Sequence, residues 1–264
     1  MMRIHFFKYH GTGNDFILLD NRLGTYHHLS TEQIRFLCDR HFGIGADGLM
    51  LLSTQEGYDF RMTYFNSDGS ESTMCGNGGR CITAFAAHLG LVSDKAQFVA
   101  IDGPHEAKLI GDQIELHMKN AQGIQVNETY SFLDTGSPHY VHEIEDVRDV
   151  DVRKEGALIR YSPRFKEEGV NVNFVESQGP QDIFVRTYER GVEDETLSCG
   201  TGVTACALHH IREHLGTQQV RVKTLGGELL VRCENKDGQH FEEVWLCGPA
   251  TFVFEGNIEI SEIE

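Results

Sequence analysis

The sequence has 264 residues, of which 40% are hydrophobic and 24% are charged, a composition typical of a folded globular protein rather than a disordered chain. Its 40 acidic and 23 basic residues give a formal net charge of −17, which disfavours nucleic acid and anionic membranes as partners. No apolar run reaches the length of a membrane-spanning helix, and residues 1–20 lack the apolar core and cleavage site of a signal peptide.

The first part of the chain predicts two short strands with a helix between them. Residues 16–19 and 49–52 are apolar runs typical of strands. Between them, Ser30-Thr31-Glu32-Gln33 has the pattern of a capping box, and the helix that it opens would carry Ile34, Leu37 and Cys38 on its apolar face. Residues 43–48 fit the dinucleotide-binding pattern G-x-G-x-x-G. That pattern must follow a strand and open a helix, so we interpret this segment as a glycine turn.

An internal repeat organises the rest of the chain. At an offset of 124 positions, residues 60–78 match 184–202 without gaps, and the match includes Cys75-Gly76-Asn77-Gly78 over Cys199-Gly200-Thr201-Gly202. Both copies continue into a helical pattern of apolar residues. Both patterns then stop at His-Leu-Gly, at 88–90 and at 214–216, and a glycine in this place is a helix-ending signal.

Each helical pattern is followed by paired strand-like segments around a glycine turn, at 97–118 and at 219–233. The chain therefore predicts two α/β halves of similar topology. We expect the first to span 1–120 with Cys75 and the second to span 121–250 with Cys199. The last strand-like segment, 251–264, is expected to return to the first half.

The paired cysteines suggest a specific chemistry. A thiol at a helix start lies beside unpaired amides and a partial positive charge, which lower its pKa and can also bind a carboxylate. Two such thiols on opposite faces of one carbon could remove a proton from one side and return it on the other. Cys75 and Cys199 are therefore the candidate acid–base pair of a racemase or epimerase that needs no cofactor.

The other five cysteines are interpreted as core residues. Seven cysteines in a chain without a signal peptide favour reduced thiols and a cytoplasmic location. No C-x-x-C pair is present, which disfavours a thioredoxin-type redox site, and the His and Cys spacings predict no metal site.

At these residues the sequence resembles the diaminopimelate epimerase family over nearly its whole length. The resemblance is carried by the segments 8–16, 39–48, 65–71, 74–81, 136–139, 170–174, 188–191 and 195–202. It implies two α/β (α+β) domains, each a mostly antiparallel, barrel-like sheet around a central helix. It also implies interconversion of L,L- and meso-diaminopimelate, in lysine and peptidoglycan precursor synthesis.

The resemblance also implies roles for individual residues. Cys75 and Cys199 would exchange protons with the substrate, while His139 and Glu189 would tune the ionisation of the thiols. The substrate is implied to be a small zwitterionic amino acid, held by Asn14, Asn66, Gly76, Asn77, Asn171, Glu189, Arg190, Gly200 and Thr201. No cofactor or metal is implied, and a homodimer is the expected assembly.

Three positions differ from many family members. Gly48 stands where many have Gln, Ser137 where many have Asn, and Phe254 where relatives have a tyrosine associated with the dimer interface. The first two changes would affect recognition of the distal end of the substrate, and the third weakens the expectation of a dimer.

Two alternatives remain open from the sequence. A proline or hydroxyproline racemase uses a similar cysteine pair, but Asn14, Asn66, Asn171 and Glu189-Arg190 suit a longer substrate that is polar at both ends. A catalytically silent amino-acid-binding protein of the same fold would need the helix amides but not both thiols.

Overall fold

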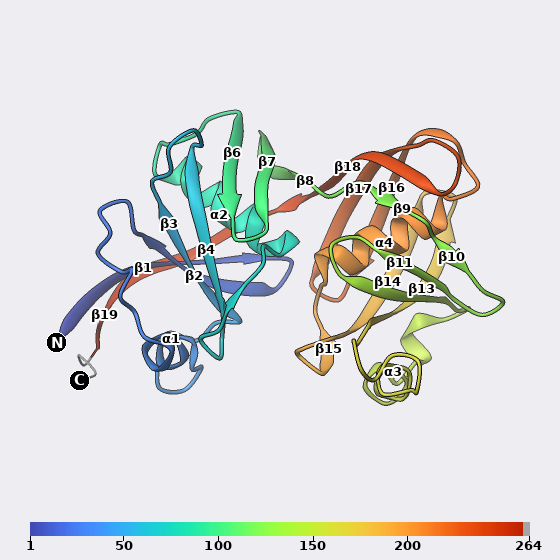
Figure 1. Ribbon diagram of the computed structural model, residues 1–264, viewed down its shortest axis with the longest axis horizontal. Helices are drawn as coiled ribbons and strands as arrows, with labels where there is room; N and C mark the ends of the chain where they lie inside the picture. Colours follow the sequence, from blue (N-terminus) through green and yellow to red (C-terminus); the bar gives the residue numbers. More distant parts are fainter. Residues whose placement is uncertain (261–264) are drawn as a thin grey trace. The chain divides into compact units, whose positions relative to one another are not determined.

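The computed structural model describes residues 1–260, which form two compact units of strands and helices (Figure 1). The first unit comprises Met1–Leu116 and the C-terminal segment that begins at Pro249, and the second comprises His117–Gly248. In the first unit, β19 (Thr251–Ile260) pairs antiparallel with β1 (Met2–Gly11). Of the segment 251–264 that was expected to return to the first half, residues 261–264 lie outside the described residues.

The first unit is built largely from antiparallel strand pairs, whereas β2–β3 and β4–β6 are parallel. After β1, its elements in chain order are β2 (Asn14–Asp20), α1 (Thr31–Cys38), β3 (Gly48–Ser53), β4 (Phe60–Asn66), β5 (Glu71–Ser72), α2 (Gly76–His88), β6 (Lys95–Ala100), β7 (Gly103–Ile110) and β8 (Gln113–His117). Helix α2 contacts β1, β2, β3 and β7, so strands of its own unit line several of its sides.

The second unit has the same character. Its elements are β9 (Ala121–Gln122), β10 (Gln125–Val126), β11 (Ser131–Asp134), β12 (Pro138–Glu143), the 3-10 helix η1 (Val147–Asp149), α3 (Val152–Arg160), β13 (Asn171–Gly179), β14 (Asp182–Glu189), β15 (Asp194–Thr196), α4 (Gly200–His210), β16 (Gly216–Thr224), β17 (Gly227–Asn235) and β18 (His240–Pro249). Helix α4 contacts β11, β12, β13, β14, β16 and β17.

The two units repeat one connectivity. The antiparallel pairs β3–β4 and β4–β5 reappear as β13–β14 and β14–β15, and the parallel pair β4–β6 reappears as β14–β16. Helix α2 follows β5, and α4 follows β15 in the same way. The sequence repeat is therefore a repeat of structure, and the predicted α/β class with two similar halves is confirmed.

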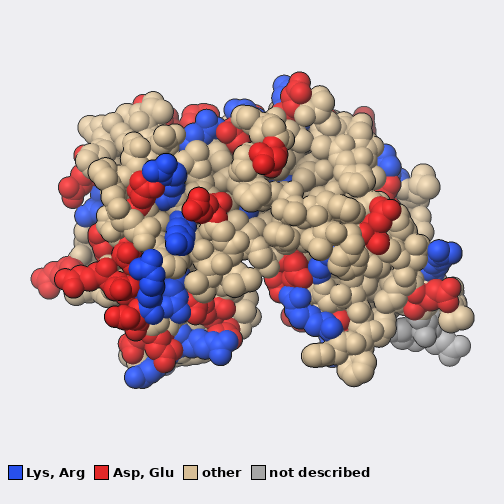
Figure 2. Space-filling model, turned by 180° about the vertical axis from the view of Figure 1, so that it is seen from behind, with Lys and Arg blue, Asp and Glu red and all other residues tan. Residues whose placement is uncertain are grey.

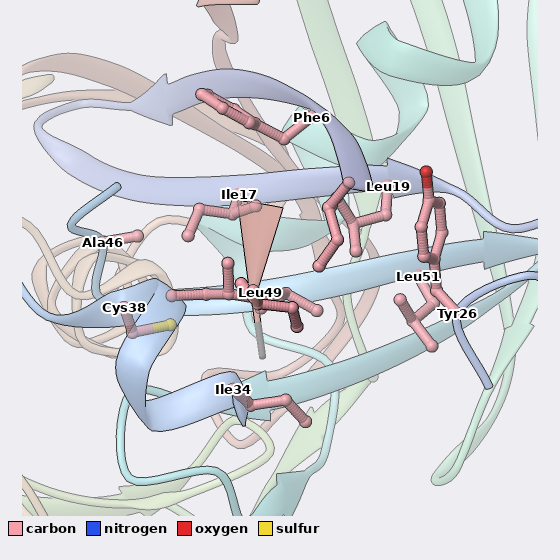
Figure 3. Close-up of a cluster of buried hydrophobic side chains, with 12 residues drawn as sticks. Phe6, Ile17, Leu19, Tyr26, Ile34, Cys38, Ala46, Leu49 and Leu51 are labelled. Carbon is pink, nitrogen blue, oxygen red and sulfur yellow. The ribbon is translucent and has the colours of Figure 1, made fainter. Parts of the chain in front are cut away.

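The capping box predicted at residues 30–33 is present at the start of α1. Ser30 accepts from the backbone N–H of Gln33, whose side chain accepts from the Ser30 N–H in return. An isolated helix of this length is not stable in water, so burial of its apolar face must hold it in place. Figure 3 shows Ile34 and Cys38 of α1 in one buried cluster with Ile17 and Leu49 of the strands. Each such side chain contributes about 1.5–3 kcal/mol when fully buried.

The second repeated helix ends earlier than its sequence suggests. The pattern predicted a stop at His214-Leu215-Gly216, but α4 ends at His210, and Gly216 begins β16. Asn235, which is buried in β17, donates its side-chain amide to the carbonyl oxygens of Ile211, Arg212 and His214. Asn235 therefore supplies hydrogen bonds to these carbonyl oxygens from outside the helix, and the helix ends before Gly216.

Charged side chains of both signs are interleaved on the face drawn in Figure 2 rather than gathered in a basic patch. Within residues 1–260, no helix is both long enough and apolar enough to cross a membrane.

Candidate functional site

Cys75 occupies the N-cap position of α2. Its backbone is extended (φ −106°, ψ 150°), and its Sγ accepts a hydrogen bond from the backbone N–H of Gly78 at 3.2 Å. The residue is half-buried. An amide hydrogen bond and the positive end of a helix both favour the thiolate over the thiol. Cys75 therefore has the local environment expected of a reactive thiol.

The glycines after Cys75 lie close to neighbouring side chains. A Cβ on Gly78 would lie 2.4 Å from Cε of Met50 and 3.0 Å from Sγ of Cys75. A Cβ on Gly79 would lie 2.9 Å from Sδ of Met74. The Met50 methyl group and the Met74 sulfur lie at the ends of flexible side chains that can move aside, whereas a Cβ at position 78 would also crowd the Cys75 sulfur.

Asn77 connects the Cys75 turn to the N-terminal motif. Its Nδ2 donates to Oδ1 of Asn14 at 3.3 Å, and Nδ2 of Asn14 donates to Oδ2 of Asp47 at 2.7 Å. Three segments that are distant in the sequence therefore meet here. The structure brings together two of the predicted substrate-binding residues, Asn14 and Asn77.

A charged cluster supports this connection. Asp15 pairs with Lys8 and with Arg40, each at 2.7 Å, and Arg40 also pairs with Asp47 at 2.7 Å. Burial by itself raises the pKa of Asp15, but hydrogen bonds from Arg40 and Lys8 outweigh it and lower that pKa to about 2. Asp15 is therefore ionised at neutral pH and anchors the Arg40–Asp47 pair that orients Asn14.

Arg80 lies fully buried under the first turn of α2. Its Nη1 donates to the carbonyl oxygen of Gly76 at 3.2 Å, and its Nη2 donates to Oδ1 of Asn77 at 2.9 Å and to Thr12 Oγ1 at 3.4 Å. Its Nε lies 3.5 Å from the carbonyl oxygen of Pro249. A guanidinium with several fixed donors can orient these groups together. Arg80 thus orients the Asn77 side chain and places a positive charge on the first turn of α2.

Gly48 and Asn66 lie opposite each other in β3 and β4. A Cβ on Gly48 would lie 2.5 Å from Cε2 of Tyr64 and 2.6 Å from the carbonyl oxygen of Phe65. The Tyr64 ring therefore fills the space where the side chain of the family's glutamine would begin. Asn66 is the last residue of β4 and begins the turn after it, in which its Nδ2 lies 3.4 Å from Oγ of Ser70. Within residues 1–260, no hydrogen bond joins Asn66 to the Cys75 turn.

Cys199 occupies the matching N-cap position of α4 in the second unit. Its backbone is also extended (φ −109°, ψ 112°), and its Sγ lies 3.5 Å from the hydroxyl oxygen of Thr201. Across the described residues, its sulfur does not cap a backbone amide of the helix as that of Cys75 does. The carbonyl oxygen of Thr201 accepts from Thr135 Oγ1 at 2.8 Å, which ties this turn to the loop before β12.

Asn171, Ser137 and Arg190 form one polar cluster in the second unit. Nδ2 of Asn171 donates to Ser137 Oγ at 2.9 Å, and its Oδ1 accepts from the backbone N–H of Arg190 at 2.9 Å. Nη2 of Arg190 donates to the same Ser137 Oγ at 3.3 Å, and Nη1 donates to the carbonyl oxygen of Glu168. The serine that replaces the family's asparagine is thus bonded to both predicted substrate-binding residues.

Glu189 is the last residue of β14 and His139 lies near the start of β12, and β13 pairs with both of these strands. Oε2 of Glu189 accepts from the hydroxyl of Thr196 at 2.9 Å. His139 is fully buried, and its Nδ1 lies 3.1 Å from Nδ2 of Asn173. Burial, and secondarily the nearby charge of Arg190, lower the pKa of His139 to about 3. The imidazole is therefore neutral at physiological pH.

The other five cysteines, Cys38, Cys81, Cys206, Cys233 and Cys247, are all buried. Burial raises the pKa of Cys38 to about 12 and that of Cys233 to about 12. It also raises the pKa of Cys81 and Cys206 above the usual range. These four thiols are protonated at neutral pH and suit the predicted core role. Among residues 1–260, no group of three His, Cys, Asp or Glu side chains is placed to hold a metal ion.

The sequence motifs contain the site, but sequence reasoning missed several residues that support it. These are Thr12, Asp15, Arg40, Asp47 and Arg80 in the first unit, and Thr135 and Asn173 in the second. Most stand inside the same motif segments as the predicted residues. Their place inside these motif segments was the available signal.

Comparisons with known proteins agree on one family. The family model described as diaminopimelate epimerase matches residues 6–124 and 131–253. The chain is 49% identical over 254 residues to a diaminopimelate epimerase of Flavobacterium psychrophilum, with 96% of this chain and 99% of the relative covered. It is 44% identical to one of Chlorobaculum tepidum, with 95% and 99% covered.

Solved structures share the fold at low sequence identity. A phenazine biosynthesis protein of the PhzF family from Bacillus anthracis superposes with a TM-score of 0.76 at 13% identity, covering 98% of this chain and 100% of the other. A hydroxyproline epimerase from Agrobacterium vitis superposes with a TM-score of 0.70 at 13% identity, covering 97% and 92%. At such identities the likeness concerns the fold alone.

Proposed function

Because the chain belongs to the diaminopimelate epimerase family, we propose that Cys75 and Cys199 act as the acid–base pair of its reaction. The chain is an epimerase that interconverts L,L- and meso-diaminopimelate, a step in the synthesis of lysine and of peptidoglycan precursors. The observation that carries the two-thiol mechanism is the recurrence of Cys-Gly-x-Gly at a helix start in both repeated units.

In this mechanism one cysteine is a thiolate and the other a thiol. The thiolate takes the α-proton, so that an S–H bond forms as the C–H bond breaks and the electron pair remains on the α-carbon. The thiol then gives its proton to the opposite face of that carbon, and the two cysteines end with exchanged protonation states. The proton removed and the proton returned are both carried by cysteine side chains of this chain, so each transfer balances without another reactant.

The helix starts would stabilise the charge that develops. The backbone amides of Gly76 and Asn77, and those of Gly200 and Thr201, lie at the positive ends of α2 and α4 and suit the carboxylate at the reacting centre. By donating hydrogen bonds to that carboxylate, these amides would stabilise the negative charge that the carbanion delocalises onto it.

The remaining predicted residues would hold the substrate and tune the thiols. Arg190 can pair with both oxygens of a carboxylate, and Ser137 and Asn171 already fix the position of its guanidinium and backbone. Asn14, Asn66 and Asn171 offer amide groups for the amino and carboxylate ends. Glu189 and His139 would tune the ionisation of the thiols. Glu189 would also bind an ammonium group of the substrate.

The mechanism is tested by incubating the reduced protein with L,L-diaminopimelate in deuterium oxide. We expect one deuterium at the inverted α-carbon, detected by mass spectrometry, together with the meso isomer on chiral chromatography. Meso product that carries no solvent deuterium would contradict proton transfer through exchangeable thiols. Exchange with proline in place of diaminopimelate would favour the proline racemase alternative, and binding without exchange would favour the silent binder.

We also propose that the protein works as a homodimer in the cytoplasm. Three consecutive apolar residues of β19 are exposed: Phe252 by 42%, Val253 by 49% and Phe254 by 45%. Phe254 packs against Phe6 and Phe252 against Tyr9, and aromatic side chains that stay partly exposed in this way are enriched at protein interfaces. A reducing compartment is required because both reacting thiols must stay reduced.

A further inference from the structure

The turn of the β6–β7 hairpin contacts the segment that leads into the Cys75 helix start. Oδ1 of Asp102, which lies in this turn, accepts a hydrogen bond from the backbone N–H of Met74 at 3.3 Å. Met74 directly precedes Cys75, the N-cap residue of α2. The backbone amide of the residue before the cysteine is therefore held by a side chain that lies 28 residues further along the chain.

His105 of β7 holds the same carboxylate. Its Nε2 lies 3.1 Å from Oδ1 of Asp102, and both side chains are largely buried, with exposed fractions of 7% for His105 and 16% for Asp102. Burial by itself raises the pKa of Asp102, but the hydrogen bond and charge of His105 and the amide of Met74 outweigh it and lower that pKa. The carboxylate is therefore ionised at neutral pH. Because an ionised carboxylate can only accept, the amide of Met74 and Nε2 of His105 must both donate to it.

The ring of His105 is fixed by aromatic stacking. It lies opposite Phe98 in the β6–β7 pair, with the ring centroids 5.3 Å apart and the planes at 30°. Phe98 in turn stacks on Phe60 of β4 at 4.9 Å, and both phenylalanines are fully buried. A ring packed in this way has few other rotamers open to it, so its Nε2 is already directed at Asp102.

The second unit makes an equivalent contact by another means. At the repeat offset of 124 positions, Asp102 corresponds to Gly226 in the turn of the β16–β17 hairpin. The backbone N–H of Gly226 donates to the carbonyl oxygen of Leu197 at 2.8 Å, two residues before the cysteine of that helix start. His105 corresponds to Leu229, whose side chain cannot donate a hydrogen bond. Both hairpin turns therefore hold the segment before a helix-start cysteine, one through a carboxylate and the other through a backbone amide.

A contact that recurs in both units with different chemistry points to a role for the contact itself. We propose that Asp102 is a positioning residue that fixes the backbone leading into Cys75, and that His105 holds the Asp102 carboxylate in place for that bond. Cys75 is then kept in the N-cap geometry in which the Gly78 N–H reaches its sulfur. The effect on the reaction rests on the proposed function of Cys75, whereas the positioning does not.

The positioning is measured by nuclear magnetic resonance of protein labelled with ¹⁵N-methionine, at neutral pH and without substrate. The amide signal of Met74 is assigned by its absence in Met74→Leu. We expect this amide to exchange its hydrogen with water at least about tenfold faster in Asp102→Ala, which removes the acceptor. Asp102→Asn keeps an acceptor oxygen and should stay close to the wild-type rate. A wild-type exchange rate in Asp102→Ala would overturn the proposal, whatever the epimerase activity.

The part played by His105 is tested with His105→Leu, which introduces the side chain found at the equivalent position of the second unit. The variant removes the donor to Asp102, so we expect the Met74 amide to exchange faster than in the wild type and more slowly than in Asp102→Ala. His105→Gln keeps a donor and should bring the rate back toward that of the wild type. A wild-type rate in His105→Leu would overturn the role of His105.

The consequence for the reaction is measured by steady-state kinetics. We expect Asp102→Ala to lower kcat about tenfold with KM changed by less than about threefold, because it displaces a reacting group and leaves the substrate-binding side chains in place. Asp102→Asn should recover most of this loss. Asp112→Ala is the matched control, because Asp112 is an exposed carboxylate in the turn of the next hairpin, β7–β8. It should change neither kcat nor the exchange of the Met74 amide.

A wild-type kcat in Asp102→Ala, together with a freely exchanging Met74 amide, would overturn the role of this contact in catalysis. If Asp102→Ala does not fold, the comparison of His105→Leu with His105→Gln decides the same question. The amide measurements need no turnover, so a failure of the two-thiol mechanism would be seen separately, in the deuterium experiment on the wild-type protein.

Discussion

Arg80 donates from Nη1 to the carbonyl oxygen of Gly76 at 3.2 Å, one turn back toward the start of α2. The equivalent position of α4 in the repeat is Thr204, whose hydroxyl donates to the carbonyl oxygen of Gly200 at 2.9 Å. The two helix starts thus share a hydrogen bond but differ in charge. A buried guanidinium binds the carbonyl oxygen of the residue after Cys75, whereas a neutral hydroxyl binds that of the residue after Cys199. From this difference and the amide bond to Sγ of Cys75 we predict that Cys75 reacts faster with electrophiles than Cys199 does.

Removing the charge of Arg80 should therefore slow the reaction of Cys75 with an alkylating reagent. For Arg80→Met we expect about a tenfold lower alkylation rate at Cys75 with iodoacetamide, equivalent to roughly one pKa unit, and little change at Cys199. Peptide mass spectrometry of the quenched protein reports both rates in one experiment. Arg80→Lys keeps the charge and should recover most of the Cys75 rate.

Arg22→Met is the matched control, because Arg22 forms a surface ion pair with Asp20. It should leave both alkylation rates unchanged. Circular dichroism must show that Arg80→Met is folded, since it leaves buried oxygens without their donor. A folded Arg80→Met with the wild-type rate at Cys75 would contradict the electrostatic role.

Replacing either proposed acid–base cysteine should stop epimerisation while preserving the fold. We expect Cys75→Ala and Cys199→Ala each to lower kcat by at least about 100-fold, the usual contribution of a positioned acid or base. Cys233→Ala is the control, because its thiol is buried in β17 and burial raises its pKa to about 12. Near-wild-type turnover in either reacting variant would rule out the two-thiol mechanism.

The sequence predicted those parts of the fold that local signals determine. The capping box at Ser30, the strands at 16–19, 49–52 and 251–260, and the two Cys-Gly-x-Gly helix starts all lie where the pattern indicated. The repeat added the information that the two halves share one topology. These features depend on residues within a few positions of each other, so one sequence suffices to find them.

The parts that were missed depend on contacts between distant segments. The end of α4 is decided by Asn235, which lies in another strand and captures the carbonyls that would continue the helix. Arg80 and Asn173 each stand in a recognised motif, but their roles depend on which neighbours the fold places around them. The effect of Gly48 likewise became clear only from the Tyr64 ring beside it.

The proposed homodimer predicts that an exposed aromatic residue of β19 is required for assembly. Phe254 is 45% exposed, and its ring packs edge-on against Phe6 of β1. Phe254→Glu would place a charge in an apolar interface, so we expect a monomer in sedimentation velocity where the wild type is a dimer. Phe42→Glu is the control, because Phe42 is 80% exposed and lies outside β19. A monomeric wild-type protein would exclude the dimer outright.

Adding one methyl group at Gly202 should disturb the second helix start. The Cβ of Gly202→Ala would lie 2.4 Å from Oδ1 of Asn173, so either the Asn173 side chain or the first turn of α4 must move. We expect a loss of about 1–3 kcal/mol in the free energy of unfolding, measured with urea, and a lower kcat. Gly179→Ala is the matched control, since its Cβ would meet nothing closer than 3.8 Å. Equal stability of the two variants would show that the turn has room for the methyl group.

Asp15 should make the stability of the fold depend on pH in a defined window. Its pKa is lowered to about 2 in the folded protein, below the value of about 3.9 expected when unfolded. The ionised carboxylate therefore stabilises the fold above about pH 4, and this contribution is lost as the pH falls from there toward the folded pKa. Because Arg40 is 55% exposed, solvent screening limits the contribution to about 1–2 kcal/mol.

Urea unfolding of Asp15→Asn tests this contribution. At neutral pH the variant's free energy of unfolding should lie below that of the wild type by this deficit, and the deficit should shrink toward pH 3. Asp112→Asn, at an exposed turn, should have the wild-type free energy of unfolding at every pH. A deficit that stays constant over this range would mean that Asp15 acts through the shape of its hydrogen bonds and not through its charge.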